Sequence, residues 1–158
     1  MILPISFARV LQSHRRLTVL VVAFALFQTG CATAPTQPAI DFALTRISPN
    51  KQFVVTLIPP ADTIRIQQFH RWQINVATAD GAPLTDALVY LNAGMPEHGH
   101  GLPTRPAVTQ EISPGKYLVE GVKFNMSGWW EIYVAVQKVP ASDVTTFNYM
   151  VAVASGGG

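Results

Sequence analysis

The stretch Trp129–Lys138 (WWEIYVAVQK) decides the fold, because apolar and polar side chains alternate along it. Its apolar set consists of Trp130, Ile132, Val134 and Val136. A period of two residues is typical of a β-strand with one buried face. We therefore predict a strand here, with Trp130 in a hydrophobic core and Trp129 either at the surface or over a neighbouring loop.

Six further runs with strand-like composition lie on either side of this one. They are Gln52–Ile58, Arg65–Thr78, Ala87–Asn92, Ala107–Ile112, Lys116–Val122 and Val144–Val153. Turn-forming residues separate them, for example Asp80-Gly81 and Ser113-Pro114-Gly115. Short strands at this spacing are typical of an antiparallel β-sandwich. The sequence therefore predicts an all-β, immunoglobulin-like sandwich of about seven strands, without the Cys…Trp…Cys core of true immunoglobulin domains.

The N-terminus has the pattern of an export signal. Three arginines precede Leu17–Phe27, an uncharged and mostly apolar run. This run is shorter than the roughly 20 residues that a membrane-spanning helix needs, and it fits the apolar region of a signal peptide. Thr29-Gly30-Cys31 follows it and resembles the lipobox of bacterial lipoproteins, in which the cysteine is acylated and becomes the first mature residue. The alternative is a secretory signal cleaved after residues 32–34, with loss of Cys31.

These features predict a division of the chain into four parts. Residues 1–30 are expected to be a lipoprotein-type signal peptide, and residues 31–49, rich in Ala, Thr and Pro, a flexible tether. Residues 50–153 are expected to form the sandwich, and residues 154–158 a disordered tail. Cys31 would anchor the domain to a membrane of the cell envelope through lipid, with the domain facing the periplasm.

The composition excludes several classes of protein. The single cysteine excludes a disulfide framework and any multi-cysteine metal site. The net charge of +2 becomes −1 once residues 1–30 and their three arginines are removed, and no basic patch is interleaved with aromatic residues. Nucleic-acid binding is therefore not expected. No nucleophile elbow, phosphate loop or metalloprotease motif is present, so we expect a protein that is not an enzyme.

The segment Met95–Gly101 (MPEHGHG) is the strongest candidate for chemistry. His98 and His100 lie at i and i+2, which places both imidazoles on one side of an extended backbone, about 7 Å apart at Cα. Met95 adds a thioether three residues upstream. Imidazole with thioether suits copper, particularly Cu(I), and zinc is the alternative if Glu97 or water completes the site. The other interpretation is an exposed loop whose glycines only shape a turn.

The order of the strands brings further residues toward this loop. If successive strands alternate in direction, the connections at 59–65, 94–106 and 123–128 lie at one end of the sandwich. Met126 would then lie close to His98 and His100, and His70 would lie toward the same end. We therefore add Met126 and His70 to the candidate copper ligands. The alternatives are a methionine at the edge of the core and a hydrogen-bonded histidine at its rim.

The loop Met95–Thr104 and the segment Gly115–Glu131 together resemble the YtkA-like/FixH-like group of small exported or membrane-anchored bacterial domains. This resemblance covers roughly residues 50–153 and implies an immunoglobulin-like sandwich. With the loop chemistry, it leads us to expect an envelope lipoprotein that binds copper for buffering or for delivery to an envelope copper protein. The alternative is a metal-free module that docks a protein or small ligand with the same loop end.

Overall fold

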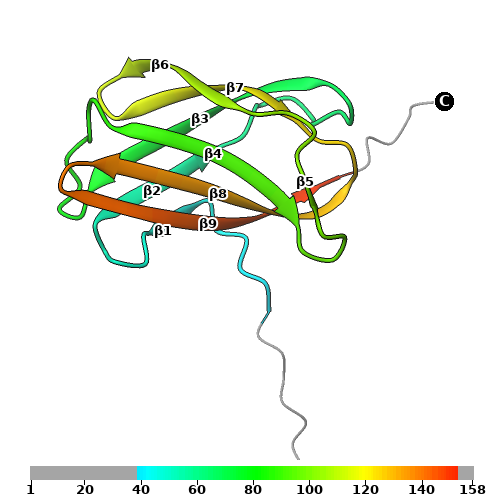
Figure 1. Cartoon of the computed structure of the whole chain (residues 1–158), viewed down its shortest axis with the longest axis horizontal. Coiled ribbons are helices and arrows are strands. Elements are labelled where there is room, and N and C mark those ends of the chain that lie inside the picture. The colour runs from blue at the N-terminus through cyan, green and yellow to red at the C-terminus, as the bar shows by residue number, and fades with distance from the viewer. Residues whose placement is uncertain (1–38, 153–158) are drawn as a thin grey trace, which may run out of the picture. The chain divides into compact units, whose positions relative to one another are not determined.

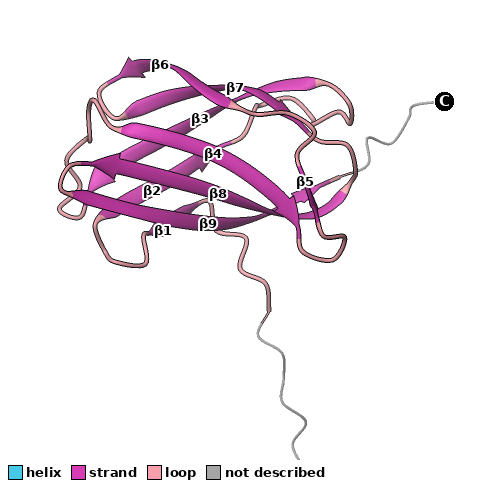
Figure 2. Ribbon diagram, in the orientation of Figure 1, coloured by secondary structure: helices cyan, strands magenta, loops and turns pink. Residues whose placement is uncertain are grey.

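The computed structural model describes residues 39–152, which form strands, turns and loops without a helix (Figures 1 and 2). The strands are β1 (Thr45–Ile47), β2 (Phe53–Ile58), β3 (Phe69–Thr78), β4 (Leu88–Met95), β5 (His100–Gly101), β6 (Ala107–Ser113), β7 (Lys116–Lys123), β8 (Gly128–Lys138) and β9 (Ala141–Val151). The predicted signal peptide, Cys31 and the C-terminal tail lie outside the described residues. Within residues 39–152, no helix has the length and hydropathy needed to cross a membrane.

The strands form two antiparallel sheets, which confirms the predicted β-sandwich. One sheet has the order β1-β2-β3-β7-β6 and the other the order β5-β4-β8-β9 (Figure 1). The longest ladder joins β8 to β9 and pairs every residue from Gly128 to Lys138. The alternating stretch Trp129–Lys138 is thus part of a central strand of the second sheet.

Residues 39–152 form nine strands rather than about seven, because two short strands have too few residues to show a periodic pattern. β5 has two residues and pairs with the end of β4. β1 has three residues and pairs with β2. β1 lies inside residues 31–49, so the C-terminal part of the expected tether is instead the edge strand of a sheet. Its side chains also bind locally, since Arg46 forms an ion pair with Asp41 at 2.9 Å.

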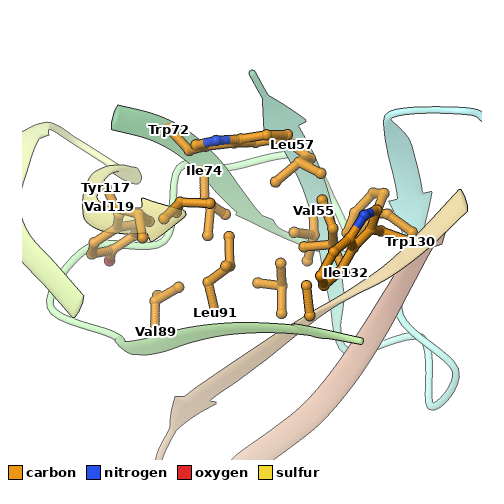
Figure 3. Packing of buried hydrophobic residues seen from close by; sticks show 14 of the residues in the cluster. Val55, Leu57, Trp72, Ile74, Val89, Leu91, Tyr117, Val119, Trp130 and Ile132 are labelled. Atoms are coloured by element: carbon orange, nitrogen blue, oxygen red, sulfur yellow. The ribbon is translucent and has the colours of Figure 1, made fainter. Parts of the chain in front are cut away.

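The core lies between the two sheets and follows the predicted alternation. β3 contributes Trp72, Ile74 and Val76, and β8 contributes Trp130, Ile132, Val134 and Val136, all of them at most 2% exposed. Figure 3 shows Trp72, Ile74 and Val119 of the first sheet facing Val89, Leu91 and Ile132 of the second. Burying side chains of this size contributes roughly 1.5–3 kcal/mol each. Trp130 is fully buried whereas Trp129 is only partly buried, as the parity of the strand predicts.

The connections gather at the two ends of the sandwich as the strand order predicts. At one end, which we call the loop end, lie the connections β2–β3, β4–β5 and β7–β8. There the Gln67 amide donates to the Phe124 carbonyl at 2.8 Å. At the opposite end, the Val76 amide donates to the Gly115 carbonyl at 2.7 Å, and Lys138 Nζ donates to the Asp86 carbonyl at 3.2 Å. The candidate residues are therefore carried to the loop end by the topology.

Candidate metal centre at the loop end

His100 and Met126 meet at the loop end, although 26 residues separate them in sequence. The distance from His100 Nε2 to Met126 Sδ is 3.2 Å. His100 belongs to β5, and Met126 lies in the connection between β7 and β8. Two ligand types that copper prefers therefore come together because two connections share one end of the fold.

The β4–β5 hairpin sets the position of His100. The amides of His98 and Gly99 both donate to the Met95 carbonyl, at 3.1 and 2.9 Å, which closes a tight turn. Gly99 has a φ of +67°, a conformation that glycine adopts at little cost. The turn pairs His100 directly with Met95 across the hairpin. Because directly paired residues point to the same face, the His100 side chain is aimed toward the interior, where Met95 lies.

The surroundings of His100 are mostly apolar. Its ring is 5.9 Å from the Trp130 ring, centroid to centroid, at an interplanar angle of 68°, an edge-to-face arrangement. Its Nδ1 atom is buried and has no hydrogen-bond partner among the described residues. Buried nitrogens without partners are uncommon, because leaving one unpaired costs about 1–3 kcal/mol. Among the described residues, the His100 side chain therefore has one polar contact, from Nε2 to Met126 Sδ, and none at Nδ1.

His98 lies on the solvent side of His100. The two rings are stacked, with centroids 5.9 Å apart and planes inclined by 25°. The His98 side chain is exposed, and the residue lies within the turn that precedes β5. An exposed side chain changes rotamer at small cost, so His98 can swing toward an ion held at His100 and Met126.

Met95 is part of the core rather than of the surface. It is 2% exposed, and its Cε lies only 3.1 Å from the place where a Cβ on Gly128 would stand. Its thioether therefore packs beneath the hairpin, on the inner side of His100. Met95 therefore forms the buried base of the candidate site. Met126 is 39% exposed and is the accessible thioether.

His70 has a different environment. Its Nε2 lies 2.8 Å from the Arg65 carbonyl, and since a carbonyl only accepts, Nε2 carries the proton. It lines an open cavity of about 940 Å³ together with Phe69, Arg71 and Glu120. Its neighbours thus do not belong to the His98–His100 hairpin, and it behaves as the hydrogen-bonded rim residue that the sequence offered as the alternative.

The register of the first sheet changes next to His70. His70 pairs with Val122 and Trp72 with Val119, so β7 has one residue more than β3 between these pairs. Gly121 lies in this bulge with a φ of +83°. Bulges redirect the side chains around them. Here Arg71 Nε and Glu120 Oε1 form an ion pair at 2.7 Å, so each of the two charges has a partner.

No group of three or more His, Cys, Asp or Glu side chains converges within residues 39–152. The nearest carboxylate on the paired strands, Glu131 opposite Gly94, accepts a hydrogen bond from the Tyr133 hydroxyl at 2.7 Å. This hydrogen bond, with burial and the carboxylate charge, raises the pKa of Tyr133. The donor set at the loop end therefore consists of imidazole and thioether groups, without a free carboxylate from the strands.

The separation of His100 and Met126 is close to what a shared ion needs. With a metal about 2.0 Å from nitrogen and about 2.3 Å from sulfur, and an angle of about 110° between them, the two ligand atoms stand about 3.5 Å apart. The observed 3.2 Å requires an opening of a few tenths of an ångström. Met126 is on a loop and half exposed, so this movement disturbs little of the core.

Comparison with known proteins gives one family. Residues 50–135, more than half of the chain, match the YtkA-like family. No curated protein matches the chain. Among solved structures, the ZirS C-terminal domain aligns with a TM-score of 0.38 and 12% sequence identity, covering 76% of this chain and 83% of that one. The FixH-like and lipoprotein parts of the resemblance stay predictions. The chain belongs to the YtkA-like family.

Proposed function

We propose that this YtkA-like domain is a non-enzymatic copper-binding module of the cell envelope, anchored through a lipid on Cys31. It binds the ion with His98, His100 and Met126, and it buffers copper or hands it to an envelope copper protein. The observation that carries the proposal is the 3.2 Å contact between His100 Nε2 and Met126 Sδ.

The donor set favours copper over zinc. Thioether sulfur is a soft ligand that selects Cu(I), whereas zinc sites in proteins use thiolate, imidazole and carboxylate. Among residues 39–152, the sulfur that contacts His100 is the thioether of Met126, and Glu131 is engaged by Tyr133. Glu97 lies exposed in the turn and is the carboxylate that a zinc site would use, so a zinc titration beside the Cu(I) titration compares the two ions. Three neutral ligands are sufficient for Cu(I), which tolerates low coordination numbers.

The exposure of the ligands suits release as well as capture. His98 is exposed and Met126 is 39% exposed, so a partner can approach two of the three ligands directly. Exchange of the ion through a mixed set of ligands from both proteins then needs no opening of the core. This accessibility is the reason for proposing buffering or delivery rather than a structural metal.

The test is a Cu(I) titration of the purified full chain in competition with a chromogenic chelator. The double variant His98→Ala/His100→Ala should lose at least about 100-fold in affinity, because two ligands are removed. His70→Ala is the matched control, since it removes an imidazole from the other side of the loop end, and it should bind as the wild type does. Equal affinity in the wild type and the double variant would end the proposal.

The alternative is a metal-free interaction module. It is favoured by Met150, which is 52% exposed and lies opposite Trp129 on the outer face of the second sheet. These two side chains lie next to the loop end, because the neighbouring pair Gly128 and Val151 is the end of the β8–β9 ladder on that side. A protein that binds no copper, but loses a captured partner on Trp129→Ala, would support this function instead.

A further inference from the structure

Trp130 contacts both ligand-bearing segments of the candidate site. Its indole Nε1 donates a hydrogen bond to the Met126 carbonyl at 3.2 Å. The edge-to-face contact with His100, at 5.9 Å between centroids, involves the same indole. The β5 hairpin and the β7–β8 connection are therefore joined through one side chain.

Trp130 is itself held firmly. It is 0% exposed, and its ring meets that of Phe124 at 5.0 Å and 75°. Phe124 in turn contacts the Trp72 ring at 6.1 Å, which continues the packing into the first sheet. On the other side, the backbone of Trp130 pairs with Tyr149 in the long β8–β9 ladder. The indole is thus a buried, well-packed contact beneath two segments that lie nearer the surface.

The position of the segment that carries Met126 depends on its contact with Trp130. Between Phe124 and the start of β8 lie only Asn125, Met126 and Ser127, and Met126 is exposed. The hydrogen bond from Trp130 is a contact that ties the backbone of Met126 itself to the core. Without it, the carbonyl would turn toward water and the thioether would no longer stay beside His100.

We infer that Trp130 is the positioning residue of the copper site, because it sets the Met126 backbone and the plane of the His100 ring at once. This inference rests on the proposed function. Groups that orient metal ligands typically change metal affinity by about 10–100-fold when they are removed. In the sequence, the alternation of Trp129–Lys138 places Trp130 in the core and indicates no part for it in the site.

The first test compares two tryptophan variants of the full chain. Trp130→Phe keeps an aromatic ring in the core but removes the N–H that binds Met126. Trp72→Phe is the matched control, because Trp72 is equally buried and its Nε1 has no hydrogen-bond partner among the described residues. We expect Trp130→Phe to weaken Cu(I) binding by about 10–100-fold and Trp72→Phe to leave it within about twofold.

A double-mutant cycle separates positioning from general damage. If Trp130 acts through Met126, Trp130→Phe should have little further effect on affinity in a Met126→Leu background. Fully additive effects, or equal affinity in Trp130→Phe and the wild type, would overturn the inference while the proposed function stands. A wild-type chain that binds no Cu(I) would overturn the proposed function, and the inference with it.

A second measurement needs no variant that must fold. In the nitrogen-15 spectrum of the wild-type chain, the three indole N–H groups are expected to give separate signals, because their surroundings differ. Addition of Cu(I), which is diamagnetic, should shift the Trp130 indole signal, whereas that of Trp72 should stay in place. An unchanged Trp130 signal at saturating Cu(I) would overturn the inference.

Discussion

Gly128 leaves room for the methyl group of Met95, and this small residue decides where one of the three described methionines can lie. Its φ is +119°, and a Cβ there would come within 3.1 Å of Met95 Cε. Met95 therefore fills the core under the hairpin, while Met126 stays accessible. From sequence alone both methionines are candidate ligands, because nothing in the residue types shows which thioether is buried.

Substitution of Gly128 tests this arrangement. Gly128→Ala should lower the free energy of unfolding by about 2–4 kcal/mol, because it adds both backbone strain and a contact with Met95. Gly81→Ala is the control, since Gly81 has a similar φ of +91° but open space around it. Urea denaturation measures both variants. A Gly128→Ala variant no less stable than Gly81→Ala would contradict the close packing of Met95.

At the scale of elements, the strands that sequence predicts and the strands that it misses differ in length. The long ones, such as β3 and β8, show a period of two and are predicted to within a few residues of their observed ends. β5 consists of only His100 and Gly101, and its existence depends on the turn that Gly99 allows. The pairing of Met95 with His100, which directs the imidazole inward, is therefore visible only in the structure.

The edge strand β9 is tied to the segment that precedes β2 by Asp143. The Asn50 amide and side chain donate to its carboxylate at 2.7 and 3.1 Å. Burial alone would raise the pKa of Asp143, but hydrogen bonds from Ser48, Asn50 and Val144 outweigh it and hold the pKa below its usual range. This contact spans both sheets, so it contributes to the stability of the whole sandwich.

The lowered pKa of Asp143 determines how the stability of the fold depends on pH through this contact. A carboxyl whose folded pKa is lowered stabilises the fold above its unfolded pKa of about 3.9 and loses that contribution as the pH falls through the folded value. Asp143→Asn should therefore be less stable than the wild type at pH 7, and the difference should shrink below about pH 4. Thermal melts across pH 2–7 measure it. A difference that does not change with pH would show that the charge has no part in this contact.

At the scale of the whole molecule, the antiparallel order of the strands creates the candidate site. The sequence predicts correctly that the connections at 94–106 and 123–128 share one end, and the structure confirms that His100 and Met126 meet there. The strand order alone does not show that the loop end has two separate surfaces, one beside the β4–β5 hairpin and one beside His70. His70 lies in the first sheet beside the Gly121 bulge, and the side chains around it form a different surface.

The attachment of the molecule to a membrane is a separate prediction. If Cys31 is acylated, a labelled fatty acid should be incorporated into the wild-type chain and not into Cys31→Ser, which should leave the membrane fraction. Release of the wild-type chain into the soluble fraction without label would show cleavage by an ordinary signal peptidase. This result would leave the copper site unaffected, because His98, His100 and Met126 all belong to the sandwich.

The fold brings His100 and Met126 together, and we propose that they hold one copper ion. X-ray absorption at the copper edge of the Cu(I)-loaded full chain tests it most directly, with Met126→Leu and Met150→Leu compared. We predict a sulfur neighbour at about 2.3 Å in the wild type and in Met150→Leu, and its loss in Met126→Leu. A copper shell without sulfur in the wild type, or one that Met126→Leu leaves unchanged, would contradict the account.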